Sequence, residues 1–508
     1  EEEGEDHREA AAGRDATATT VPGPSAAFTP EYARLHVPYA SICGDEDDDA
    51  ATSGSSDARA VPPVTTTPEA RPTAYRSTLL RELAWRGMIH AATPGLDDRL
   101  AADPRIAGYN GFDPSGPSLH IGSLVPIMGL LHLQRSGGRP VALVGGGTGM
   151  IGDPSGRSSE RNLLDAATLQ ANVAGIRSQL ERFLDFEAGG SGAVMVNNLD
   201  WLGPLSMIEF LRDTGKHFTV PYMLRKDSVQ KRLDGGLSFT EFSYMLLQSY
   251  DFLRLLRDHG VELQMGGADQ WGNITAGLQL IRRVAGGGEE TDDDGEVRTD
   301  LAHGLSYPLF TDPSGAKFGK TADGTSVWLD PARTSPYAFY QYWLASEDAD
   351  LAGRLRVFTL LDQETIQALE AEHATAPERR LGQRTLARDV TARVHGEEET
   401  ARAVRVSEVA FSGEVPTDPA LLAALHAALD QFEFGPGTLE AGALALAVES
   451  GLYASNGEAR RAISQGGFSI NGERVAAPDA PVPAPLAGEY LLVRHGRRTL
   501  RVGRLRRA

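Results

Sequence analysis

The middle of the chain alternates short apolar runs with longer segments whose apolar residues recur at helical spacing. The first helical segment, STLLRELAWRGMIHAAT, begins near Ser77. The runs RIAGYNGF, RPVALVGGG, AVMVNN and VELQMGG have the length and composition of buried strands. Strands that alternate with helices in this way predict an α/β fold, in which helices cover both faces of a doubly wound parallel sheet. Ligands of such sheets bind beyond the carboxyl ends of the strands.

The segments on either side of this region follow other patterns. The first 77 residues are rich in Ala, Thr, Pro, Ser and Asp and have no sustained period, which predicts a disordered leader. From about Thr334 to Ser412 the pattern is helical, and the last part reads as helix, turn, helix and hairpin, then two strands. The predicted units are a leader at 1–77, an α/β domain at 78–311 with an insert at 286–300, a loop linker at 312–334, an α-helical domain at 335–432 and a small α+β module at 433–508.

The composition is that of a globular protein. Of the 508 residues, 41% are hydrophobic and 23% are charged. No run approaches the roughly 18 consecutive apolar residues that a membrane-spanning helix needs. The first residues are acidic, so we expect no signal or transit peptide there. The single cysteine, Cys43, excludes an internal disulfide framework and predicts a cytoplasmic protein.

The net charge of −20 does not exclude a nucleic-acid partner, because the charge is unevenly distributed. Residues 1–77 carry a net charge of −9 and residues 287–300 carry −6. In the last twenty residues, by contrast, seven arginines face only Glu489. These are Arg494, Arg497, Arg498, Arg501, Arg504, Arg506 and Arg507. Such a local basic run indicates either an RNA-binding surface or a solvated tail.

Three glycine-bearing clusters could carry chemistry. In GFDPSGPSLHIGS, His120 and Ser123 fall where a helix begins, and a helix N-terminus can bind anions. VGGGTGMIGDPSGRSSER lacks the ending of a phosphate-binding P-loop, and its Asp153 could face a ligand or cap a turn. In DPSGAKFGKTADGTS, Lys317 and Lys320 could reach a polyphosphate. Taken singly, each cluster is also compatible with an ordinary turn or exposed loop.

One helical segment, SFTEFSYMLLQSYDFLRLL, carries a polar stripe on an otherwise apolar sequence. Tyr244, Gln248 and Asp251 stand at positions i, i+4 and i+7, so they line one face. This face is either the solvent side of the helix or the wall of a ligand pocket.

Together these motifs resemble the bacterial tyrosyl-tRNA synthetases, a family of class I aminoacyl-tRNA synthetases. GFDPSGPSLHIGS resembles the HIGH-motif region of that family, and KFGKT resembles its form of the KMSKS motif. IGDPSGRSSER, FTEFSYMLLQSYDFLRL and MGGADQWGNITAGLQLIR resemble further blocks in the family order. The resemblance runs from about residue 78 to the C-terminus. It implies a Rossmann-like catalytic domain, a KMSKS-type loop, an anticodon-side helical domain and a C-terminal RNA-binding module.

The resemblance also implies which side chains bind tyrosine. Tyr109 and Asp251 would flank the phenol, one donating and one accepting a hydrogen bond. Tyr244, Gln248 and Asp153 would hold the ammonium group, and Gln270 would lie near the carboxylate.

The other implied site residues belong to ATP. The catalytic set around its phosphates would be His120, Ser123, Lys317, Lys320 and Thr321. The set around the ribose and the head of the amino acid would be Gly111, Asp113, Gly267 and Asp269. ATP would be a substrate that brings Mg²⁺, with no metal tightly bound by the protein. Tyrosine would be activated as its adenylate and transferred to tRNA(Tyr) by a homodimer that has no membrane association.

Two positions depart from the family pattern. Ser123 replaces the second histidine of the HIGH motif, and Arg157 stands where a lysine is common. Ser123 and Arg157 both keep a side-chain hydrogen-bond donor.

Three alternative functions stay open. The tryptophan enzyme is disfavoured by Tyr109 with Asp251, because indole offers one donor and no acceptor. An RNA-binding protein without catalysis would leave the intact active-site motifs unexplained. A nucleotidyltransferase for a small metabolite would leave the C-terminal RNA-binding module unexplained.

Overall fold

The structure is a computed structural model that describes residues 75–152, 165–226, 229–230, 233, 236–285, 301–311, 318–319, 324–496 and 499–506. All of these belong to one compact unit, Thr67–Ala508. The leader and the insert at 286–300 lie outside the described residues, as does Arg157.

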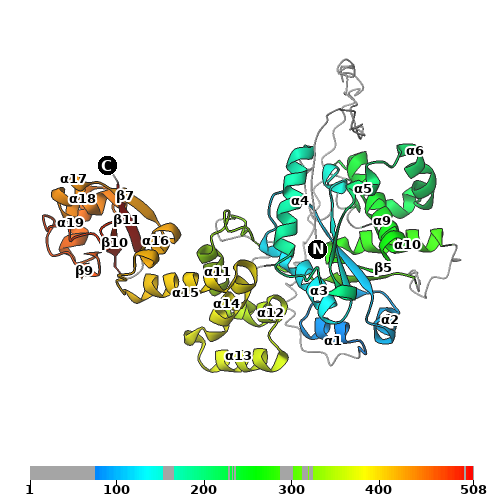
Figure 1. The fold of residues 1–508 in the computed structure, drawn as a ribbon, viewed down its shortest axis with the longest axis horizontal. Coiled ribbons are helices and arrows are strands. Elements are labelled where there is room, and N and C mark those ends of the chain that lie inside the picture. Colours follow the sequence, from blue (N-terminus) through cyan, green and yellow to red (C-terminus); the bar gives the residue numbers. More distant parts are fainter. Residues whose placement is uncertain are drawn as a thin grey trace, which may run out of the picture. The chain divides into compact units, whose positions relative to one another are not determined.

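A six-stranded sheet organises the first part of the chain, with the strand order β1-β6-β5-β2-β3-β4 (Figure 1). Its strands are β1 (Ala91–Ala92), β2 (Ala107–Phe112), β3 (Arg139–Val144), β4 (Val194–Asn197), β5 (Val261–Gly267) and β6 (His303–Tyr307). All neighbours are parallel except β1 and β6. The chain runs outward from β2 to β4 and then returns to place β5 on the other side of β2. The sheet therefore has its topological switch point between β2 and β5, and the predicted α/β fold is confirmed.

Helices cover both faces of the sheet because successive strand residues point to opposite sides. Along β3, Ala142 and Val144 enter the cluster that contains α3 (Leu124–Arg135) and α4 (Ala166–Leu180), whereas Val141 and Leu143 face α9 (Phe239–His259) and α10 (Trp271–Val284). Figure 1 shows these two helix pairs on opposite sides of the sheet. The shorter helices of this part are α1 (Thr78–Trp85), α2 (Leu96–Ala102), α5 (Leu199–Leu202), α6 (Met207–Glu209) and α7 (Val220–Leu224).

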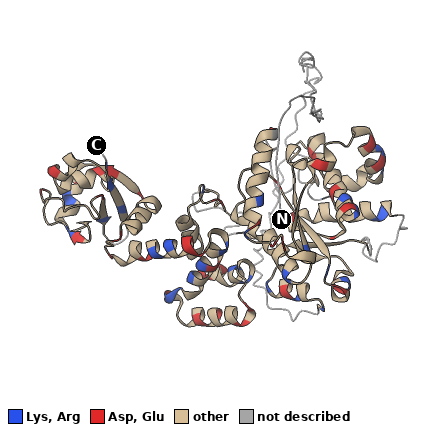
Figure 2. Cartoon of the chain, in the orientation of Figure 1, with Lys and Arg blue, Asp and Glu red and all other residues tan. Residues whose placement is uncertain are grey.

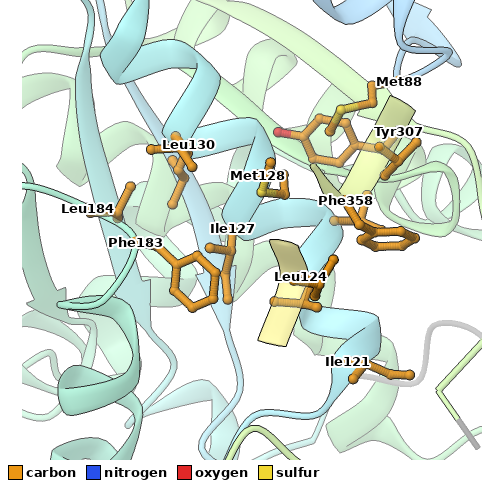
Figure 3. Packing of buried hydrophobic residues seen from close by; sticks show 14 of the residues in the cluster. Met88, Ile121, Leu124, Ile127, Met128, Leu130, Phe183, Leu184, Tyr307 and Phe358 are labelled. Atoms are coloured by element: carbon orange, nitrogen blue, oxygen red, sulfur yellow. The ribbon is translucent and has the colours of Figure 1, made fainter. Parts of the chain in front are cut away.

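The next five helices do not form a separate core. They are α11 (Pro336–Leu344), α12 (Asp348–Phe358), α13 (Gln363–Thr375), α14 (Leu381–His395) and α15 (Glu397–Ser412). Their large side chains, among them Trp343 and Phe358, belong to the same buried cluster as α3. Figure 3 shows Phe358 beside Leu124 and Tyr307. We call this common cluster the shared core.

The last part of the chain has its own sheet, in the order β7-β11-β10-β8-β9. Its elements are α16 (Pro419–Ala428), β7 (Gln431–Phe434), α17 (Pro436–Ala441), α18 (Ala443–Glu449), α19 (Asn456–Ser464), β8 (Phe468–Ile470), β9 (Glu473–Arg474), β10 (Tyr490–His495) and β11 (Thr499–Leu505). One apolar cluster joins the sheet to α18 and α19, and a second joins it to α16 and the end of α15. We call residues 419–506 the C-terminal module.

Candidate active site

A cavity of about 240 Å³ opens at the switch point of the first sheet. Its walls come from the ends of β2 and β5, the loop after β3, and α9. The lining residues include Tyr109, Gly111, Asp113, Gly145, Thr148, Tyr244, Gln248, Asp251, Gln264, Gly267, Asp269 and Gln270. Nine predicted site residues are thus brought together from three separate segments. The position agrees with the rule that α/β sheets bind ligands beyond their strand ends.

Asp251 and Tyr109 are among the most buried polar residues of this cavity, each with 1% of its surface exposed. Asp251 accepts hydrogen bonds from Trp201 Nε1 at 2.7 Å and from Asn198 Nδ2 at 2.9 Å. Burial raises the pKa of the Asp251 carboxyl to about 7, although both hydrogen bonds act in the opposite direction. Burial, and then the charge of Asp251, raise the pKa of the Tyr109 phenol. Among the described residues the Tyr109 hydroxyl has no hydrogen-bond partner, so the pair can serve a ligand hydroxyl.

Asn198 fixes Asp251 to the glycine-rich loop after β3. Its Oδ1 accepts from the backbone N–H of Gly147 at 2.7 Å, and its Nδ2 donates to Thr148 Oγ1 at 2.9 Å as well as to Asp251. The sequence analysis missed both Asn198 and Trp201. Asn198 directly follows β4, so the rule about strand ends could have identified it. Trp201 lies one helical turn further on and gave no such signal.

The polar stripe of α9 lines the cavity. Gln248 Nε2 donates to Gln270 Oε1 at 3.3 Å, and Asn273 Nδ2 donates to the same oxygen at 3.1 Å. Among the described residues the buried Gln248 Oε1 has no donor. Tyr244 is buried on the same face. This wall therefore presents amide and hydroxyl groups that suit the polar head of an amino acid.

Glycines allow the backbone to approach the two carboxylates at the mouth of the cavity. A Cβ at Gly267 would lie 2.6 Å from Asp269 Oδ1, and a Cβ at Gly145 would lie 3.1 Å from Asp113 Oδ1. A side chain at either position would displace the carboxylate. Gly111, by contrast, has open space beside it.

His120 and Ser123 lie next to this site but do not line the cavity. His120 is exposed at the start of the 3₁₀ turn Ile121–Ser123, where its Nδ1 accepts from the backbone N–H of Gly122 at 3.0 Å. Its ring meets Trp328 edge to face with a centroid distance of 6.3 Å. Ser123 is half-buried and directly precedes α3. The predicted site residues Asp153, Lys317, Lys320 and Thr321 lie outside the described residues.

The C-terminal arginines that the structure describes are engaged within the molecule. Arg494 donates to the carbonyls of Val409 and Ala410 at the end of α15, and Arg501 donates to the carbonyl of Ser450. Arg504 and Arg506 pair with glutamates. Figure 2 shows basic and acidic residues interspersed along the elements of the C-terminal module. Three other arginines of the module are exposed, namely Arg460, Arg461 and Arg474.

The described residues include neither a membrane-spanning helix nor a metal-binding cluster. No helix there is long and apolar enough to span a bilayer. No group of three or more His, Cys, Asp or Glu side chains in that part of the chain is placed to hold a metal ion.

The fold is that of a class I aminoacyl-tRNA synthetase. Residues 102–412 match the family model described as tRNA synthetases class I (W and Y), and residues 438–501 match the tyrosine--tRNA ligase SYY-like C-terminal domain. The chain is 49% identical over 430 residues to a tyrosine--tRNA ligase of Cytophaga hutchinsonii, covering 82% of this chain and 97% of that protein. It is 50% identical over 438 residues to a tyrosine--tRNA ligase of Anaeromyxobacter dehalogenans, covering 84% and 99%.

A solved structure supports the same conclusion. A C-terminally truncated mitochondrial tyrosyl-tRNA synthetase from Coccidioides posadasii matches with a TM-score of 0.55 and 31% sequence identity, over 64% of this chain and 91% of the other. The chain belongs to the tyrosine--tRNA ligase family, and the resemblance inferred from the sequence is confirmed.

Proposed function

We propose that the cavity at the switch point is where tyrosine and ATP react, and that Tyr109 and Asp251 select tyrosine there. The reaction is that of the family: tyrosine is activated with ATP to tyrosyl-adenylate and pyrophosphate, and is then transferred to the 3′ end of tRNA(Tyr). One observation carries the placement of the substrate. A buried hydroxyl that has no partner among the described residues lines the same cavity as a buried carboxylate, and this combination suits a phenol that both donates and accepts a hydrogen bond.

The same pair accounts for selection against phenylalanine. A phenol satisfies both polar groups, whereas a phenyl ring leaves them buried and unpaired. Tyr244 and Gln248, with Asp153, then hold the ammonium group, and Gln270 lies near the carboxylate.

The ATP phosphates lie towards the start of α3. The tyrosine carboxylate attacks the α-phosphorus, and the leaving pyrophosphate takes up the negative charge. No covalent intermediate with the protein is required, so positioning and electrostatic stabilisation provide the acceleration. The groups we assign to the phosphates are His120, Ser123, Lys317, Lys320 and Thr321. The groups we assign to the ribose and the head of the amino acid are Gly111, Asp113, Gly267 and Asp269. Mg²⁺ enters with ATP and is bound largely through its phosphates.

The later units serve the tRNA. We assign residues 335–432 to the anticodon side and residues 433–508 to RNA binding, where the exposed Arg460, Arg461 and Arg474 offer contacts to phosphates. Residues 1–77 are a leader, residues 78–311 are the catalytic domain with its insert at 286–300, and residues 312–334 are the loop linker. The protein works in the cytoplasm, where a single cysteine stays reduced.

The protein acts as a homodimer through the segment between α5 and α9. Six of the eleven exposed large apolar residues among those described lie within residues 207–239, including Ile208 and Phe239, each 71% exposed. Such a concentration on one segment marks a protein interface, and a second copy of the chain forms it by self-complementary contact. Changing Ile208 to Asp should yield monomers in light scattering after gel filtration. The matched change of Phe411, 69% exposed at the end of α15, should leave a dimer. Monomers in the unaltered protein would contradict this assignment.

ATP–pyrophosphate exchange tests the function directly. Purified protein should exchange with tyrosine and not with phenylalanine or tryptophan. Exchange with tryptophan would refute the assignment of Tyr109 and Asp251. No exchange with any of the three, in protein shown to be folded, would refute the proposed activity and direct attention to Ser123.

A further inference from the structure

Phe318 lies within the KFGKT motif and inserts its ring among aromatic side chains of the helical region. Its ring stacks on Phe358 of α12, with a centroid distance of 5.1 Å and an interplanar angle of 15°. Trp343 and Tyr342 of α11 lie 5.8 and 6.2 Å away. The guanidinium carbon of Arg354 lies 5.6 Å from the same ring centroid. Three aromatic rings and one cation therefore hold a single side chain.

The backbone of Phe318 and Gly319 is held as well. The N–H of Phe318 donates to the carbonyl of Phe310 at 3.2 Å, and the carbonyl of Gly319 accepts from Val327 at 3.1 Å. A Cβ at Gly319 would lie 3.5 Å from His120 Nδ1, so the two motifs meet at this point. Gly319 has a φ of 120°, which disfavours any other residue.

The elements that hold Phe318 are themselves fixed. Arg354 forms an ion pair with Asp350 at 2.8 Å and donates to Ser346 Oγ at 2.9 Å, so its guanidinium has one preferred place. Phe358 ends α12, where its ring is buried in the shared core. Phe318 itself is only half-buried. The ring therefore adds little to the core, and its contacts serve chiefly to place the motif.

We infer that Phe318 is a positioning residue for the ATP step, which anchors the motif to α11 and α12. The inference rests on the proposed roles of Lys317 and Lys320 at the phosphates. Lys317 directly precedes Phe318 in the chain, and Lys320 directly follows Gly319. Electrostatic stabilisation of a leaving pyrophosphate depends steeply on where the cations stand. An aromatic anchor between the two lysines limits where both can reach.

The test separates the ATP step from folding and from tyrosine binding. In Phe318→Ala, kcat for ATP–pyrophosphate exchange should fall by roughly 10- to 100-fold, the loss expected when reacting groups shift by about 1 Å. The Kd for tyrosine, measured by equilibrium binding without ATP, should stay unchanged. Phe318→Tyr keeps the ring and should restore most of the rate. Gly319→Ala, which strains the adjacent backbone, should reproduce the loss.

Phe339→Leu is the matched control. Phe339 is fully buried in the same cluster and meets Trp343 edge to face at 6.2 Å, but it belongs to α11 and not to the motif. This variant should melt at a lower temperature and keep its exchange rate. A Phe318→Ala protein with unchanged exchange, or one that loses tyrosine binding and melting temperature together, would overturn the inference. Absence of exchange in the unaltered protein would instead overturn the proposed function.

Discussion

The helical region and the C-terminal module both follow the catalytic domain along the chain, yet they are built differently. Helices α11 to α14 place Phe339, Trp343 and Leu386 in the shared core with α3. The two clusters of the C-terminal module contain, among the described residues, no side chain from strands β1 to β6. The helical region is therefore energetically part of the catalytic domain, although its sequence reads as a separate unit. The C-terminal module can loosen without disturbing the cavity.

Removal of the C-terminal module should have the largest effect, because it should separate tyrosine activation from tRNA charging. A chain that ends after Ser412 keeps the shared core and the cavity, so tyrosine-dependent pyrophosphate exchange should persist. Charging of tRNA should fall by at least about 100-fold, because the proposed phosphate contacts of the module would be lost. Both rates can be measured on one preparation. Equal losses in the two reactions would show that the module is coupled to the active site.

A change inside the cavity should leave both regions folded and still impair the reaction. Asp251→Ala removes the buried carboxylate that we assign to the phenol, so kcat/KM for tyrosine should fall by roughly 100-fold, about 3 kcal/mol for a hydrogen bond to a charged group. Because the pKa of Asp251 is about 7, the tyrosine affinity of the unaltered protein should weaken as the pH falls below this value. The variant should lose that dependence. Unchanged tyrosine affinity and rate would refute the pocket assignment.

Two arginines that donate to carbonyls at helix ends allow the regions to be compared directly. Arg86, at the end of α1, donates to the carbonyls of Arg356, Thr359 and Leu361 at 2.6, 2.8 and 2.8 Å. These carbonyls lie at the C-terminus of α12, where helix carbonyls lack partners and a cation is favourable. Arg86→Met should lower the free energy of unfolding by about 3 kcal/mol, since buried carbonyls would be left unpaired. Denaturant titration measures this loss.

Arg494→Met is the counterpart, because Arg494 makes the equivalent contact from β10 to the end of α15. Arg494 is half-buried and makes two such hydrogen bonds, so the free energy of unfolding should fall by about 1 kcal/mol. Tyrosine activation should not change. A larger effect of Arg494 than of Arg86 would contradict the comparison.

Acid should act on the shared core through two buried histidines. Burial, followed by nearby arginines, lowers the pKa of His132 to about 3, and burial lowers that of His395 to about 4. The unfolded chain binds protons at these histidines below about pH 6.5, whereas the folded protein does not. Stability is thus complete above pH 6.5 and declines as the pH falls towards 4, by about 1.4 kcal/mol per histidine for each pH unit.

His132→Leu should flatten this decline when stability is followed by denaturant titration between pH 7 and 4.5. An unchanged slope in the His132 variant would show that another group controls the acid response.

The amino-acid sequence by itself determined the order of strands and helices, and with it the α/β fold. Apolar runs and helical spacing are local properties, so they persist whatever the tertiary contacts are. The same applies to the polar stripe of α9, whose three residues must share a face of any helix. The glycine-bearing turns after β2 and β3 marked the right sheet edge, because strand ends of a parallel sheet meet there.

Only the tertiary structure decided which groups meet across long stretches of chain. Asn198 and Trp201 hold Asp251 from about fifty residues away, and Arg86 reaches carbonyls some 270 residues further along. No spacing rule predicts such pairs, since they depend on the crossover that returns β5 beside β2. The contacts of Arg494 could not be predicted from the sequence either. A basic run predicts a charged surface, but whether a given guanidinium faces solvent or caps a helix is decided by the nearest unpaired carbonyl.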